Sequence, residues 1–271
     1  RKVPQKGIKI TKITGQDLPK ETLNNVAGVA GNAFLLAADY DGGFEIEINK
    51  KIKPGSGIGS SAASSTGAVW AMNHLLGNPF TKTELVKFAM EGERLASGVA
   101  HADNVAPALF GGFTLVRSYN PLDIVTIPAP FELYVTIIHP QIEIKTSDSR
   151  KILKTTISME TGIKQWGNVG GLVAGLFKED YELIGRSLED HIVEPIRSIL
   201  IPGFDEVKKV SLEAGALGSG ISGSGPSIFA FSKGEETALK VGEMIKSVYE
   251  KIGIAYEIHV SKVNMEGVKL L

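Results

Sequence analysis

Hydrophobic and polar positions first form a regular pattern at residues 44–48, where FEIEI alternates the two kinds of side chain. A period of two is typical of a strand with one buried face, so we expect a strand here. The glycine-rich stretch PGSGIGSSAASST follows at residues 54–66. It leads into an Ala-rich segment that predicts a helix ending near Gly77 and Pro79.

A second helix is predicted over TELVKFAMEGERLASG, at residues 83–98. Thr81 and Glu84 have the spacing of a capping box, which marks a helix start. Glu93 is expected beside the apolar stripe, at the edge of the buried face. The expected stripe consists of Leu85, Phe88, Ala89, Leu95 and Ala96.

The stretch SYNPLDIVTIPAP at residues 118–130 has three prolines and weak periodicity, so we predict a domain boundary there. The chain would then consist of domains 1–128 and 129–271. The run FELYVTIIHP opens the second half and is typical of a strand covered on both faces. Further elements are expected as helices at 205–214 and 235–252 and strands at 226–232 and 256–260. Helices alternating with non-adjacent strands indicate an α+β fold, with helices packed on one face of a sheet.

Composition narrows the possible functions. The chain has 271 residues, 43% hydrophobic and 22% charged, with a formal net charge of −1. This balance favours neither nucleic acid nor an anionic membrane as a partner. The absence of cysteine excludes disulfides, thiolate zinc sites and cysteine nucleophiles. No apolar run approaches the length of a membrane span, so we expect a soluble cytoplasmic protein. The scattered histidines do not have the spacing of an imidazole metal site: His74, His101, His139, His191 and His259.

The glycine-rich stretch at 54–66 has the features of an anion site. The first amides of a helix have no partner inside the helix, and the aligned peptide dipoles place partial positive charge there. Glycines allow close backbone approach to a phosphate, and serine hydroxyls add donors or a magnesium ligand. The alternative is an ordinary capped helix after a flexible turn. A Walker loop is excluded because no lysine follows the last glycine.

Two other stretches each have a structural and a functional interpretation. GSGISG at 218–223 matches the dinucleotide fingerprint in its letters. That fingerprint requires a strand before it and a helix after it, whereas here a helix precedes and a strand follows, so a nicotinamide dehydrogenase is rejected. The loop either connects helix to strand tightly or lines a ligand. HADNVAPALFGGF at 101–113 is either a hydrogen-bonded turn or a substrate-binding segment, and turns are commoner.

Taken together, these three stretches resemble the GHMP kinase superfamily, and within it the homoserine kinases. PGSGIGSSAASS is similar to the superfamily's ATP loop, and GISGSGPSIFAF to its C-terminal glycine motif. HADNVAPALFGGF, IKTSDSR at 144–150 and VEPIRSILIPGF at 193–204 resemble homoserine kinase segments. The resemblance covers the whole chain. It implies a two-domain fold, with a ribosomal S5 domain 2-like N-terminal domain and a ferredoxin-like C-terminal domain.

The resemblance also implies ATP-dependent phosphorylation of L-homoserine in threonine biosynthesis, with magnesium, and a homodimer. Proteins of this kind begin with a strand and a substrate motif of the type PASxxNxxxGFD, which this sequence does not contain. Loss of a first strand would leave an unpaired sheet edge, so we expect a preceding segment of a few dozen residues in the intact protein. Two substrate contacts and any targeting peptide would lie in that segment.

The family pattern assigns roles to individual residues. It implies that the backbone of the glycine loop wraps the ATP phosphates, through Pro54, Gly55, Ser56, Gly57, Ile58, Gly59, Ser60, Ser61, Ala62, Ala63 and Ser64. It implies a magnesium site at Ser61 and Glu93, and hard oxygen ligands of this kind suit magnesium. Taken alone, Glu93 would be interpreted as a surface ion-pair partner of a nearby arginine.

For homoserine, the pattern implies contacts from His101, Asn104, Thr146, Arg150, Arg197 and Gly223. A free α-carboxylate requires an arginine fork, for which Arg150 and Arg197 are the candidates. Pro195 should interrupt the helix and turn Arg197 inward, where it would also act in catalysis. His101 is assigned to substrate binding, although a structural histidine is commoner. Asp103 is a possible general base, while homoserine kinases are thought to work without one.

Two alternatives stay open. The first is a GHMP kinase for another small alcohol, such as mevalonate or a sugar. The HADN wording and the two arginines argue against it. The second is a non-catalytic sensor that binds ATP without turning it over, against which the presence of Ser61 and Glu93 counts.

Overall fold

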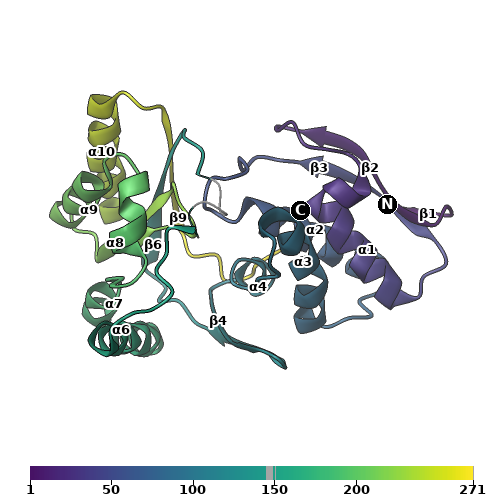
Figure 1. Cartoon of the computed structure of the whole chain (residues 1–271), viewed down its shortest axis with the longest axis horizontal. Helices are drawn as coiled ribbons and strands as arrows, with labels where there is room; N and C mark the ends of the chain where they lie inside the picture. The colour runs from purple at the N-terminus through teal and green to yellow at the C-terminus, as the bar shows by residue number, and fades with distance from the viewer. Residues whose placement is uncertain (145–148, 150, 271) are drawn as a thin grey trace. The chain divides into compact units, whose positions relative to one another are not determined.

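A computed structural model describes residues 1–144, 149 and 151–270, which fold into two compact units (Figure 1). The first unit comprises Arg1–Pro54, Gly59–Thr126 and Asn264–Leu271. The second comprises Gly55–Ile58 and Ile127–Val263. The predicted boundary between residues 128 and 129 stays a prediction, because each unit contains more than one segment of the chain. Within the described residues, no helix combines the length and the apolar character needed to cross a bilayer.

A sheet of the first unit has the order β1 (Lys2–Val3), β3 (Gly43–Asn49) and β2 (Gly7–Thr14). β3 pairs antiparallel with β1 and parallel with β2. The expected strand at 44–48 is therefore confirmed.

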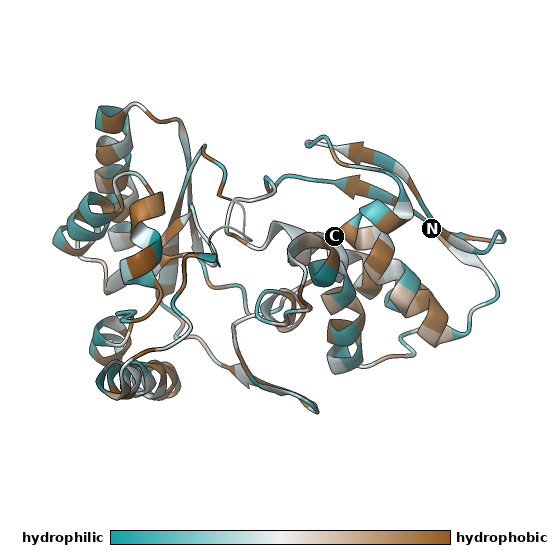
Figure 2. Cartoon of the chain, viewed as in Figure 1, coloured by the Kyte–Doolittle hydropathy of each residue, from teal (hydrophilic) through white to brown (hydrophobic). Residues whose placement is uncertain are grey.

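Helices α1 (Val26–Ala38), α2 (Ser60–Leu75) and α3 (Lys82–Ser97) pack against one another in the first unit. α1 is hydrophobic along most of its length, as Figure 2 shows, and it packs against α2, α3 and β2 while Leu36 is exposed. The short elements are η1 (Thr22–Asn24), α4 (Val105–Phe110), β4 (Phe113–Tyr119) and β5 (Leu122–Ile127). β4 and β5 pair with each other, so the proline-rich stretch at 118–130 contains a strand that its weak periodicity did not predict.

The start of α3 is as predicted, and Leu85 and Ala89 are buried as expected, but the last part of the predicted stripe is wrong. Thr81 and Glu84 form the reciprocal capping box. Leu95 and Ala96 are exposed, and the buried line runs instead through Gly92 and Glu93. The cause is a close approach of α3 to α1 and α2. A Cβ on Gly92 would lie 2.1 Å from Oγ of Ser65 and 2.7 Å from a backbone oxygen of α1, so only glycine fits.

A sheet of the second unit has the order β7 (Gly218–Ile221), β8 (Ile228–Lys233), β6 (Leu133–Pro140) and β9 (Tyr256–Lys262), with antiparallel neighbours. α9 (Phe204–Glu213) and α10 (Glu235–Ile252) pack on this sheet and on each other. Both helices show hydrophilic and hydrophobic residues in Figure 2, as expected of helices with one buried face. The remaining helices are α6 (Met159–Lys178), α7 (Tyr181–Arg186), α8 (Glu194–Arg197) and η2 (Ser198–Leu200).

The predicted elements of this unit are confirmed at 205–214, 235–252, 226–232 and 256–260 to within about two residues at each end. GSGISG is not purely a loop, because its first four residues form β7 and pair with β8. Along the chain the glycines lie between α9 and β8, and β7 contains the first two of them. No helix follows them directly, so the dinucleotide-binding fingerprint stays excluded.

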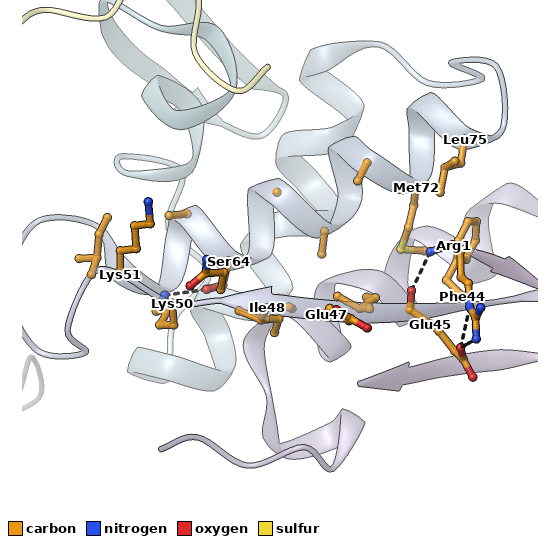
Figure 3. Close-up of a pocket in the computed structure, with 18 residues that line it drawn as sticks. Arg1, Phe44, Glu45, Glu47, Ile48, Lys50, Lys51, Ser64, Met72 and Leu75 are labelled. Atoms are coloured by element: carbon orange, nitrogen blue, oxygen red, sulfur yellow. Dashed lines mark hydrogen bonds and ion pairs between the residues drawn. The ribbon is translucent and has the colours of Figure 1, made fainter. Parts of the chain in front are cut away.

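Lys50 follows β3 directly and joins it to α2 in the first unit. Its side chain donates to Oγ of Ser64 at 2.6 Å (Figure 3). It also donates to the carbonyl oxygen of Ser60. Lys50 is only 5% exposed, and burial lowers its pKa from 10.5 to about 8. The negative charge of Glu93 opposes that shift. An ammonium group thus lies beneath the first turns of α2.

We expect Gly92→Ala to lower the free energy of unfolding by about 1–3 kcal/mol, because the added methyl group would overlap Ser65. Gly67→Ala is the matched control. No atom lies within 4 Å of a Cβ built on Gly67 in α2, so we expect this change to add about 0.5–1 kcal/mol. Urea denaturation of both variants measures the two effects. Equal stability of the two variants would contradict the close helix approach.

We expect the stability of the wild type, relative to Lys50→Met, to rise by about 1–2 kcal/mol from about pH 7.5 to about pH 9.5. Across this interval the unfolded chain binds more protons at Lys50 than the folded chain, because the folded pKa is the lower one. Stability therefore rises with pH through this group. Urea denaturation at both pH values checks the difference, with Lys51→Met as an exposed control. A difference that does not change with pH would contradict burial of the ammonium group.

Candidate functional site

Three alternating glycines shape the segment 54–61, here called the glycine loop. Gly55, Gly57 and Gly59 have φ values of +72°, +80° and +74°. Residues with a side chain rarely adopt positive φ values, which explains the glycines at these positions. Gly59 is also the N-cap of α2, and it has no side chain with which to accept hydrogen bonds from the first-turn amides. The loop therefore ends at the amides of a 16-residue helix.

Residues 222–227, here called the serine loop, hold the carbonyl groups of the glycine loop within the second unit. The hydroxyl of Ser227 donates to the carbonyl oxygen of Ser56 at 2.6 Å. The hydroxyl of Ser222 donates to the carbonyl oxygen of Gly57 at 2.9 Å. A Cβ on Gly57 would lie 2.6 Å from the carbonyl oxygens of Ser222 and Gly225, so no larger residue fits there. The two glycine-rich motifs are thus packed against each other.

These hydrogen bonds decide where the amides of the loop point. In a trans peptide, the C=O and the following N–H point in opposite directions. Fixing the carbonyl groups of Ser56 and Gly57 toward the serine loop therefore directs the N–H groups of Gly57 and Ile58 away from it. Successive amides of this kind, next to a helix N-terminus, form an anion-binding concavity.

Glu93 is buried on α3 in the first unit, with 7% of its surface exposed. Glu93 is therefore not a surface residue as the isolated sequence would suggest, and its neighbour Arg94 pairs with Glu91. Glu93 follows Gly92, which contacts Ser65, and Ser65 in turn donates to the carbonyl oxygen of Ser61 at 3.2 Å. The carboxylate therefore belongs beside the first turns of α2.

A resident metal cluster has no candidate in the part of the chain that is described, because no three His, Asp or Glu side chains gather there. Ser61 and Glu93 nevertheless fit magnesium, which commonly takes one or two protein ligands together with substrate phosphates. The buried ammonium of Lys50 acts electrostatically on Glu93 and compensates part of the cost of burying its carboxylate.

A cavity of about 410 Å³ lies between β3 and α2 in the first unit. Lys50 and Ser64 line one end, and Phe44 and Met72 lie toward the other (Figure 3). The cavity shares Ser64 with the expected ATP loop. No pattern in the sequence predicted it, since it depends on the spacing between two elements.

The expected substrate residues of the first unit lie around α4. His101 is partly buried, while Asp103 and Asn104 are exposed. Oδ1 of Asp103 accepts from the backbone amide of Asn104 at 3.1 Å. Asn104 lies next to Gly59 in the same unit, because a Cβ on Gly59 would be 3.6 Å from its Oδ1.

In the second unit, Arg197 and Gly223 lie together. The guanidinium donates from Nε to the carbonyl oxygen of Ser149 at 3.0 Å and from Nη1 to that of Gly223 at 3.2 Å. Pro195 does not interrupt a helix as expected, because it lies in the first turn of the short helix α8. Thr146 and Arg150 lie outside the described residues.

Sequence reasoning missed three groups that shape the site: Lys50, the hydroxyls of Ser222 and Ser227, and the buried His139. Hydroxyls within GISGSGPS were a visible signal, since serine often bonds to backbone groups. Lys50 and His139 carried no local signal, because each contacts residues distant in sequence.

Comparisons with known proteins agree with this geometry. Residues 17–112 match the family model for the GHMP kinases N terminal domain, and residues 172–251 match that for the GHMP kinases C terminal. A homoserine kinase from Chlorobium phaeobacteroides (strain BS1) is 49% identical over 97% of this chain and 86% of that protein. One from Pyrococcus abyssi is 37% identical over 93% of this chain and 83% of that protein.

Solved structures give the same result. The crystal structure of homoserine kinase from Cytophaga hutchinsonii is 54% identical, with a TM-score of 0.95 over 98% of this chain and 85% of that one. At lower identity the likeness shows the fold alone: the crystal structure of L. major mevalonate kinase has a TM-score of 0.70 at 17% identity, covering 96% of this chain and 84% of that one. The chain belongs to the GHMP kinases and, within them, to the homoserine kinase family of ATP-dependent small-molecule kinases.

Proposed function

We propose that this chain transfers the γ-phosphoryl group of ATP to the side-chain hydroxyl of L-homoserine, forming O-phospho-L-homoserine and ADP in threonine biosynthesis. The observation that carries this proposal is the glycine loop. Its carbonyl groups are held by the serine loop, and it ends at the N-terminus of α2.

The glycine loop binds the ATP phosphates through backbone amides. The outward N–H groups of Gly57 and Ile58 and the first-turn amides of α2 are the donors. The hydroxyls of Ser60 and Ser64 already have partners in the first unit, since Ser60 donates to the carbonyl oxygen of Ile52 and Ser64 accepts from Lys50. The phosphates therefore rely mainly on main-chain donors and on the helix dipole.

Ser61 and Glu93 would hold a magnesium ion, which supplies charge neutralisation on the phosphates when it is bound. Glu93 reaches this role through the close approach of α3 to α2 at Gly92. Lys50 keeps the region from carrying an uncompensated buried negative charge.

Homoserine is bound at its amino-acid end by His101, Asn104, Thr146, Arg150, Arg197 and Gly223. The hydrogen bonds from Arg197 to Ser149 and Gly223 fix the plane of its guanidinium, which then presents a planar donor to the α-carboxylate. Phosphoryl transfer depends on positioning and charge stabilisation, so these contacts matter more than covalent help. Arg197 also provides positive charge to the reacting groups. We expect a cytoplasmic homodimer, which stays a prediction.

We expect ADP release to depend on homoserine. With ATP, magnesium and one acceptor at a time, the rate with L-homoserine should exceed that with mevalonate, galactose or no acceptor by about a hundredfold or more. A coupled ADP assay measures this. Turnover with mevalonate or galactose in place of homoserine would contradict the proposed acceptor. ATP binding without turnover on any acceptor would indicate a sensor.

Arg197→Lys is the specificity control in the same assay. Lysine cannot make the planar pair of bonds, so the KM for homoserine should rise about 10- to 100-fold while the KM for ATP changes little. An unchanged KM for homoserine would remove Arg197 from the carboxylate site.

Asp103→Asn tests whether Asp103 acts as the general base that accepts the homoserine hydroxyl proton. If it does, kcat should fall about a hundredfold or more, while the KM values stay near those of the wild type. Near-normal kcat would show that the reaction proceeds without a protein base. The Oδ1 of an asparagine at position 103 can still accept from the Asn104 amide, so a fall in kcat would not be due to loss of this turn hydrogen bond.

A further inference from the structure

A chain of buried polar groups lies behind the glycine loop in the second unit. His139, near the end of β6, has its Nδ1 3.2 Å from Oγ of Ser227. Ser227 follows the cis peptide bond that joins Gly225 to Pro226, and its hydroxyl contacts the carbonyl oxygen of Ser56. His139 and Ser227 are 2% and 0% exposed, and Ser56 is 1% exposed. Water therefore does not replace these contacts.

The positions of the protons in this chain follow from the chemistry of its three groups. A carbonyl oxygen can only accept, so at 2.6 Å the single proton of Ser227 points to Ser56. Oγ of Ser227 then has only lone pairs to offer His139. The contact at 3.2 Å is therefore a hydrogen bond only if Nδ1 of His139 carries a proton and donates it.

The opposite arrangement would be costly. If Nδ1 were the acceptor, Ser227 would turn its proton to His139, and the carbonyl of Ser56 would keep only the backbone amide of Ser227, at 3.3 Å. The Ser56 carbonyl is one of the two that fix the amide direction of the glycine loop. Its orientation therefore depends on which ring nitrogen of His139 is protonated.

We infer that His139 is a positioning residue: its Nδ1–H donates to Ser227, which directs the Ser227 hydroxyl to the Ser56 carbonyl and so holds the glycine loop in its phosphate-binding form. The kinetic consequence of this inference rests on the proposed function, whereas the position of the proton does not. His139 touches neither substrate nor reacting atoms in this scheme, and it acts only through Ser227.

The position of the proton is measured by ¹⁵N NMR of the histidine rings in the nucleotide-free protein. The His139 signal is assigned as the one lost in His139→Gln. We expect Nδ1 to be protonated. A ring protonated at Nε2 alone would overturn the inference, whether or not the protein is a kinase.

The effect on the loop is measured by steady-state kinetics of matched pairs of variants. Ser227→Ala removes the hydroxyl, and His139→Gln removes the donor at the Nδ1 position. In each variant the KM for ATP should rise about 5- to 30-fold, as for one lost buried hydrogen bond. The KM for homoserine should change less than about twofold. Ser227→Thr keeps a hydroxyl and His139→Asn keeps an amide donor near the Nδ1 position, so both should recover most of the affinity for ATP.

Three further results separate positioning from a general packing role. His259→Gln changes an exposed histidine on β9 and should leave the KM for ATP unaltered. The double variant His139→Gln/Ser227→Ala should be no worse than the worse single variant, because both act through one chain. Additive effects, or equal losses in His139→Asn and His139→Gln, would overturn the inference. If the protein turned over no acceptor, calorimetric binding of ADP to the same variants would give the affinities instead.

Discussion

The site depends on two hydrogen bonds that hold backbone carbonyl groups. A loop can present amides to an anion only if its carbonyl groups are directed elsewhere and satisfied there. Ser222 and Ser227 meet both conditions for Gly57 and Ser56. Because each peptide unit is planar, fixing its oxygen also fixes the direction of the next N–H. The glycines follow from the same constraint, since the loop needs positive φ values and backbone contact at Gly57.

Charge burial beneath α2 imposes a second constraint on the same region. An isolated buried carboxylate is costly. The ammonium of Lys50 lies under the first turns of α2 and interacts with Glu93, which reduces that cost. Lys50 itself bears the cost of burial, visible in its lowered pKa. The fold thus gives up some stability near neutral pH by burying the ammonium of Lys50 where it interacts with Glu93.

Local patterns predicted α10, α9, β3 and β8, because each has a periodicity or end signals within its own residues. They failed where a distant contact decided the outcome. Leu95 and Ala96 suit a buried stripe, but the approach of α3 to Ser65 at Gly92 turns another line of α3 inward. GSGISG looks like a loop, and only pairing with β8 makes its first four residues a strand. Lys50 donates to residues of the next helix, and His139 contacts Ser227, 88 residues further along the chain, so neither contact shows in the periodicity of its own element.

The two glycine motifs are far apart in the sequence, yet they contact each other and act together. Ser227 and Ser56 are 171 residues apart, yet their groups are within 2.6 Å. Glycines in the first motif are required by backbone geometry, whereas serines in the second are required as hydroxyl donors. Two stretches that both look glycine-rich in the sequence therefore meet two different chemical demands, backbone geometry in the first and hydroxyl donors in the second. The second demand extends to His139, since a serine hydroxyl has one proton and its direction is decided by what lies on its other side. The direction of the Ser56 carbonyl thus depends, through Ser227, on the ring of His139.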